Sequence, residues 1–141
     1  MKRFIVVPLL LCAAALPAAA DARDASVEPT AASAKGGGFH VAFRVIHRDG
    51  DPIAVKRLRF RRLPVDCNEG PFFLSGRIPG RFRVNDRDRF HATATDPNGG
   101  EVKVNGEFVD NDRKVRGRVK ASGDFGANAN NCEGAKRYVA T

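Results

Sequence analysis

The chain has 141 residues, with 24 Lys and Arg against 16 Asp and Glu and a formal net charge of +8. This length accommodates one ordinary domain, which excludes an enzyme built from two lobes around a cleft. The chain has no Trp and one Tyr, which argues against a carbohydrate-binding platform, because sugar rings usually stack on those side chains.

The N-terminus predicts a secretory signal peptide over residues 1–20. Lys2 and Arg3 precede an apolar run from Phe4 to Leu16, and three successive alanines then provide a cleavage site of small residues. The run is shorter than the about 20 residues that a membrane-spanning helix needs. Cys12 would suit a lipid-anchored protein, but it lies in the middle of the run rather than at its end. We therefore expect an exported protein, secreted or associated with the cell envelope, without a membrane span.

Removal of that segment leaves two cysteines, Cys67 and Cys132, which are expected to pair in an oxidising compartment. A C-x-x-C redox motif is absent, so the predicted disulfide is structural. Two cysteines cannot form a structural zinc site, and the three His do not lie at ligand spacing near them. Neither a metal nor a cofactor is therefore predicted.

Residues 21–37 are rich in Ala, Ser, Pro, Gly and charge, which predicts a flexible tether. A folded domain is predicted over residues 38–141, where apolar side chains recur with a period of two, as in half-buried strands. The first strand places four apolar side chains on one face: Phe39, Val41, Phe43 and Val45. In the second strand, Val55 is out of phase with Leu58, which predicts a bulge near Lys56 and Arg57.

The later strands follow from turn residues and alternation. Short strands are expected at 72–78 and 81–85, separated by Pro79-Gly80, and another at 89–95. A hairpin turning at 110–112 is the clearest in the chain, and a short strand closes the domain around Tyr138. The predicted fold is all-β: a single disulfide-linked antiparallel β-sandwich or small barrel of seven to eight strands, expected to be monomeric.

Several of these motifs together resemble a known group. The pattern V-x-x-L-x-F-x-x-L-P-V-x-C runs from Val55 to Cys67, V-x-V-x-G-x-F ends at Phe108, K-V-x-G-x-V follows, and Asn131-Cys132-x-Gly134 comes last. Over about residues 39–140 the chain is similar to small secreted all-β domain proteins of high-GC Gram-positive bacteria, which have two cysteines and no assigned activity. The resemblance implies export and a disulfide-linked β fold, and it implies nothing about a site.

Two rows of basic residues are the strongest functional signal. They alternate with apolar residues on the second strand and on the last hairpin: Arg57, Arg59 and Arg61, and Arg116, Arg118 and Lys120. If both rows share one sheet face, they form a cationic strip suited to phosphate or carboxylate polymers, which guanidinium groups bind in bidentate fashion. The alternative is a solvated outer face with cross-strand acidic partners such as Glu107.

We therefore predict a non-catalytic binding module that engages an anionic cell-envelope or extracellular polymer through these six residues. Aromatic side chains do not interleave with the basic rows, so sequence-specific nucleic-acid binding is not expected. The alternative function is a structural or protein–protein interaction domain without a small ligand, which an exposed apolar patch on the folded surface would favour.

Three acidic pairs lie in predicted turns: Asp49 and Asp51, Asp86 and Asp88, and Asp110 and Asp112. Clustered carboxylates can bind calcium, so a calcium-stabilised β domain is a further alternative. Asp is also a common turn residue because of its local hydrogen bonds. Turn chemistry is the preferred explanation unless two of these turns meet at one end of the fold.

The sequence does not predict an enzyme. His40, His47 and His91 are spread over different strands, and neither G-x-S-x-G nor H-E-x-x-H occurs. Nothing near these histidines supplies a nucleophile, so no catalytic residue is assigned.

Overall fold

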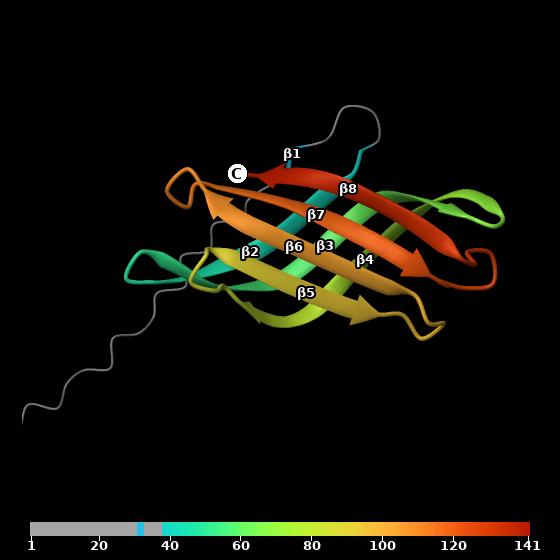
Figure 1. Cartoon of the computed structure of the whole chain (residues 1–141), viewed down its shortest axis with the longest axis horizontal. Helices are drawn as coiled ribbons and strands as arrows, with labels where there is room; N and C mark the ends of the chain where they lie inside the picture. The colour runs from blue at the N-terminus through green and yellow to red at the C-terminus, as the bar shows by residue number, and fades with distance from the viewer. Residues whose placement is uncertain (1–30, 33–37) are drawn as a thin grey trace, which may run out of the picture.

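The computed structural model describes residues 31–32 and 38–141, which form antiparallel strands and no helix (Figure 1). The strands are β1 (Ala31–Ala32), β2 (His40–Arg48), β3 (Asp51–Cys67), β4 (Gly70–Arg83), β5 (Arg89–Thr95), β6 (Glu101–Val109), β7 (Lys114–Gly123) and β8 (Cys132–Ala140). Within this part of the chain no helix is long and apolar enough to span a membrane. The expected signal peptide lies outside the described residues, as does the expected tether except for Ala31 and Ala32, which pair with β8.

All strands belong to one curled sheet. Its order is β2-β3-β8-β7-β6-β5, with β4 paired to β3 and β1 paired to β8. Figure 1 shows β5, β6, β7 and β8 across the front of the molecule and β2, β3 and β4 behind them. The sheet is a half-barrel whose open side lies between β4 and β5. The prediction of an antiparallel all-β domain of seven to eight strands is confirmed.

Two bulges bend the long strand β3. The predicted bulge near Arg57 is confirmed: the register against both β2 and β4 shifts there, and Arg57 has φ +55°. A second shift surrounds Arg62, which has φ +54° and whose backbone N–H donates to Ser75 Oγ at 3.0 Å. Bulges bend a strand and increase its twist. The bent strand therefore pairs with β2 along its first part and reaches β8 at its end, where Asp66 lies opposite Glu133.

The structure corrects the prediction of two short strands around Pro79-Gly80, because residues 70–83 form one strand, β4. β4 is an edge strand, which among the described strands pairs with β3 alone. Pro79 has no backbone N–H, but an edge strand tolerates this on the side that faces no neighbouring strand, because no ladder hydrogen bond is lost there. Gly80 has φ +120°, a conformation that glycine adopts without strain. Residues 79 and 80 face Arg57 within the bulge, so the ladder continues beyond them.

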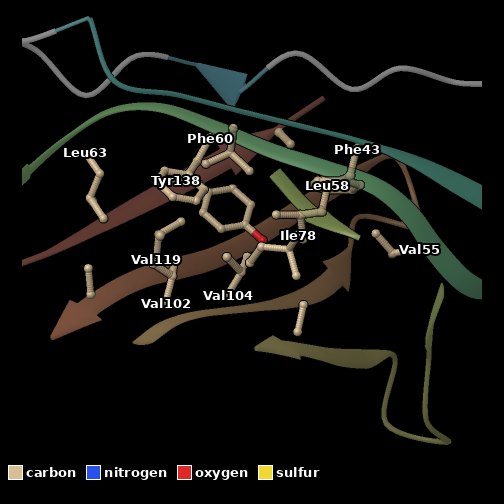
Figure 2. Close-up of a cluster of buried hydrophobic side chains, with 14 of the residues drawn as sticks. Phe43, Val55, Leu58, Phe60, Leu63, Ile78, Val102, Val104, Val119 and Tyr138 are labelled. Atoms are coloured by element: carbon tan, nitrogen blue, oxygen red, sulfur yellow. The ribbon is translucent and has the colours of Figure 1, made fainter. Parts of the chain in front are cut away.

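The core lies on the inner, concave face of the curled sheet. Figure 2 shows side chains from six strands gathered there: Phe43 (β2), Leu58 (β3), Ile78 (β4), Val104 (β6), Val119 (β7) and Tyr138 (β8). The four first-strand residues predicted to share a face are all buried. The ring of Phe43 meets those of Phe90 and Tyr138 edge-on, with centroids 5.5 Å and 6.3 Å away. Residues of β2 on one side of the molecule therefore pack directly against residues of β5 and β8 on the other.

Among the described residues, Tyr138 is the core side chain that carries a hydroxyl group. It donates to the carbonyl of Asn105 at 2.8 Å, and burial raises the pKa of Tyr138. Gly117 lies opposite Tyr138 on β7, and a Cβ there would collide with the Tyr138 ring and the Asn105 carbonyl. The glycine thus allows the tyrosine to cross β7 and reach β6.

The predicted disulfide between Cys67 and Cys132 is confirmed. It joins the end of β3 to the start of β8 and closes a separation of 65 residues. Beside it the Glu69 carboxylate accepts hydrogen bonds from the backbone N–H and the side-chain amide of Asn130. These bonds lower the pKa of Glu69. The β3–β4 turn and the β7–β8 loop are therefore held together by covalent and polar contacts.

Candidate anion-binding surface

The structure places the two predicted basic rows on different sides of the molecule. Arg59 and Arg61 alternate with buried Leu58 and Phe60, so they lie on the outer face of β3. The β7 row, Arg116, Arg118 and Lys120, likewise alternates with buried residues. Because the inner faces of the two halves meet across the core, their outer faces point away from each other (Figure 1). The single cationic strip considered from the sequence is not formed.

Cross-strand pairing instead gives each row new neighbours. On the outer face of β3, Arg59 lies directly opposite Arg77 of β4, and Lys56 lies opposite Arg81. On its other side Lys56 is opposite Arg44 of β2. We call the exposed residues Arg57, Arg59, Arg61, Arg77 and Arg81 the β3–β4 arginine surface. The sequence did not reveal Arg77 as the partner of Arg59, because their pairing depends on the bulge around Arg62, whose exact register is not encoded in alternation.

The strands that carry this surface have acidic residues only at the two ends of β3, Asp51 and Asp66. Residues 39–48, 52–65 and 70–85 contain two, five and three Lys or Arg residues respectively, and no Asp or Glu. Within residues 38–141, no ion pair involves a member of the β3–β4 arginine surface. Like charges directly opposite on adjacent strands destabilise a sheet. The arrangement therefore costs stability in the absence of an anion.

Arg57 adds a conformational cost to the electrostatic one. Its φ of +55° lies in the left-handed region, where glycine or asparagine fits with less strain than a long side chain. The bulge places this strained, exposed arginine between the Lys56–Arg81 row and the Arg59–Arg77 row. Strain held at a surface position is a feature of binding sites.

The β7 row has a different environment. Arg116 lies opposite Glu107, which also pairs with Arg89 at 3.2 Å, and Lys120 is 4.0 Å from Glu133. Nearby, Lys103 pairs with Glu101 at 2.7 Å. Acidic residues of the neighbouring strands β6 and β8 thus flank the β7 row on both sides, as expected for a solvated outer face. Of the six residues predicted to bind anions, the structure favours Arg57, Arg59 and Arg61.

The three acidic turns do meet at one end of the fold. Burial raises the pKa of Asp112 above the ordinary value of 3.8, and the charges of the nearby Asp88 and Asp51 raise it further. Among the residues described, however, no group of three His, Cys, Asp or Glu side chains is arranged to hold a metal ion. The acidic turns therefore lie together, as a calcium site would require, but their described side chains do not form a set of metal ligands.

This acidic cluster predicts a pH-dependent gain from Asp112→Asn. Because folding raises the pKa of Asp112, the folded state favours its protonated form. The folded state is therefore most stable below the pKa that Asp112 has in the unfolded chain, and it loses stability as the pH rises through the pKa that Asp112 has in the folded state. The Asn variant escapes that loss, so its melting temperature should exceed that of the native protein at about pH 7 and match it at about pH 3. Thermal denaturation across this range measures the difference.

The matched control is Asp110→Asn in the same turn. The Lys114 ammonium, 2.8 Å from the Asp110 carboxylate, holds the pKa of Asp110 below its usual value. Its charge therefore stabilises the fold at neutral pH, and the variant should melt lower there. Equal shifts for both variants would contradict the assignment.

The structure separates His91 on β5, which lines a hollow of about 260 Å³ with Glu107, from His40 and His47 on β2. His40 is exposed opposite Arg61, and His91 is exposed opposite Asn105. His47 and Asp112 line a cavity of about 290 Å³, and no Ser or Cys of the described chain lines it. The cavity brings one histidine and one Asp side chain together.

Comparison with known proteins adds no family: neither protein-family models, nor curated proteins, nor solved structures give a match. The candidate site therefore rests on its own geometry.

Proposed function

We propose that the protein is an exported, non-catalytic module that binds an anionic polymer of the cell envelope or extracellular medium through the β3–β4 arginine surface. The observation that carries the proposal is the direct opposition of Arg59 and Arg77 within stretches, residues 52–65 and 70–83, that contain no acidic residue. The repulsion between them is relieved when an anion lies between the two guanidinium groups. Export is supported by the disulfide, which persists in oxidising compartments.

The spacing of the arginines on the sheet indicates what kind of polymer fits. Neighbouring strands lie about 4.8 Å apart, and residues two apart on one strand lie about 6.7 Å apart. Arg59 and Arg61 are spaced along β3, whereas Arg59 and Arg77 are spaced across the strands. A chain that presents phosphate or carboxylate groups at such intervals contacts several guanidinium groups at once, and this multivalency raises its affinity.

A second candidate function, protein binding, is favoured by a separate observation. Phe72 and Phe73 of β4 are 42% and 51% exposed, and they line a groove at the open side of the sheet. An exposed apolar patch is the feature expected of an interaction domain. The groove is argued below.

The polymer proposal is tested by retention on purified cell-wall material and on heparin across a salt series. Replacing Arg59 and Arg77 together by Gln should lower the salt needed for elution from the wall material. The dependence of log affinity on log salt should become shallower by about one unit for each lost contact. We expect the native protein to prefer the wall material over heparin.

The matched control replaces Arg116 and Arg118 by Gln, which removes the same charge from the interleaved β7 face. This variant should elute close to the native protein. If both double variants shift equally, retention reflects net charge alone and the proposed surface is wrong. If the native protein does not bind at low salt, the arginines form a solvated face and the polymer proposal fails.

A further inference from the structure

The open side of the half-barrel contains a groove of about 510 Å³. One wall is the continuous segment from Phe72 to Arg77 of β4, and the other is formed by Ala94, Thr95 and the turn that follows β5. Phe60, Val102 and Phe125 also line it. The groove thus combines apolar side chains with polar ones, such as Ser75 and Thr95, and lies next to the disulfide-linked end of β3 and β4.

Both walls are sheet edges. β4 pairs only with β3, and β5 pairs only with β6. Outside those ladders the described backbone makes no hydrogen bond from residues 70–83 or 90–95. An unpaired strand edge offers a row of N–H and C=O groups to another chain. Pro71 and Pro79 interrupt this row on β4, which leaves residues 72–78 between them as the accessible stretch.

The charge of β4 indicates which chain would pair with it. Arg77 lines the groove, and Arg81 and Arg83 follow on the same strand, which has no acidic residue. On the opposite wall Asp96 already accepts hydrogen bonds from the backbone and side chain of Asn98 in its own turn. Asp96 keeps its negative charge on that wall, but β4 contributes three positive charges and no negative one, so the charge along the β4 edge is positive and favours an acidic partner.

From these observations we infer that the β4 edge binds an extended segment of another protein in which acidic and apolar residues alternate. The added strand pairs with the backbone of residues 72–78. Its apolar side chains enter the groove beside Phe60 and Phe72, and its acidic side chains lie on the outer face near Arg77. A second copy of this chain fits poorly, because β4 against β4 would bring arginines of both copies together.

The binding of a synthetic peptide tests the inference. The probe is a fluorescently labelled peptide of about nine residues, an ordinary strand length, in which Glu alternates with Val. Its affinity for the purified protein is measured by fluorescence anisotropy. The alternating peptide should bind at least about tenfold more tightly than a peptide of the same composition with the order scrambled. N-methylation of alternate peptide bonds should reduce its affinity by about ten- to hundredfold, because it removes the backbone donors.

Variants of the protein separate the groove from the polymer site. Phe72→Ser with Phe73→Ser should weaken peptide binding and leave retention on heparin unchanged. The matched control is Val139→Ser, which alters a side chain that is 37% exposed on the distant strand β8 and should leave both unchanged. Arg77→Glu should weaken binding of the acidic peptide and should strengthen binding of a peptide in which Lys alternates with Val. Arg118→Glu, the control on β7, should change neither affinity.

Three results would overturn the inference. Equal affinity for the ordered and scrambled peptides would exclude strand pairing, as would tight binding of the N-methylated peptide. Sedimentation of the native protein as a dimer that Phe72→Ser with Phe73→Ser dissociates would assign the groove to a second copy instead. Each of these results leaves the polymer proposal untouched, since that proposal depends on retention of the Arg59 and Arg77 variant.

Discussion

Removing the disulfide by Cys67→Ala with Cys132→Ala is expected to lower the free energy of unfolding by about 4 kcal/mol, the entropy of closing a loop of this length in the unfolded chain. A domain of about 100 residues is stabilised by about 5–15 kcal/mol in total. The melting temperature should therefore fall by about 15–30 °C. Urea denaturation and thermal melting of the variant and the native protein measure the loss.

The fold also indicates where the effect should begin. Asp66 and Glu133 are the one register pair between β3 and β8, and they lie beside the disulfide. Without the cross-link, the backbone bond from Asn68 N–H to the Asn130 carbonyl, 3.0 Å in the intact protein, should open first. Amide exchange at Asn68 should accelerate before exchange in β6. A native protein whose urea midpoint is unchanged by reductant would contradict this prediction.

Phe43→Ala is expected to destabilise the fold by about 3–5 kcal/mol, the range measured when buried phenylalanines are truncated. Phe43 is 1% exposed and makes edge-on contacts with Phe90 and Tyr138. These contacts join β2 to β5 and β8 across the core, so the cavity cannot close without moving one half of the sheet against the other. Equilibrium denaturation in urea gives the change in unfolding free energy.

The matched control is Phe73→Ala, which removes the same side chain from an exposed position. Phe73 contacts the guanidinium of Arg62 at 4.6 Å from the ring centroid, and this arrangement is worth about 0.5–1 kcal/mol at exposed sites. The loss should therefore be no larger than about 1 kcal/mol. Comparable losses for the two variants would show that Phe43 does not connect the halves of the core.

Alternation of apolar residues was sufficient to predict β2 and β5–β7 because each of these strands has one buried and one exposed face. The phase change at Val55 and Leu58 also predicted the bulge at Arg57, since an inserted residue is the simplest way to keep both side chains in the core. The disulfide followed from cysteine count and compartment. β4 was divided in the prediction because Pro-Gly normally ends a strand, whereas an edge strand tolerates both residues.

The candidate surfaces depend on register and curvature, which local patterns do not contain. Arg59 and Arg77 are separated along the chain by a turn and by the register shift between Phe60 and Leu63, so their opposition could not be derived from spacing. The sequence indicated two cationic rows but could not show that the sheet curls until they face opposite directions. Phe72 and Phe73 begin the strand predicted at 72–78, and their exposure depends on the open side of the half-barrel, which the pattern does not contain.

The positions of the disulfide and of strand β1 also determine how the domain would respond to stretching. Ala31 lies beside Ala140, so tension on β1 and on the end of β8 first separates β1 from β8 and then peels β8 from β7 one residue at a time, as far as Cys132. There the load passes through the disulfide into β3. The 64 residues between the cysteines, which would add about 220 Å of length if extended, stay outside the load path. β4 lies within that shielded loop, so its own backbone is not under tension while the two ends of the domain are pulled.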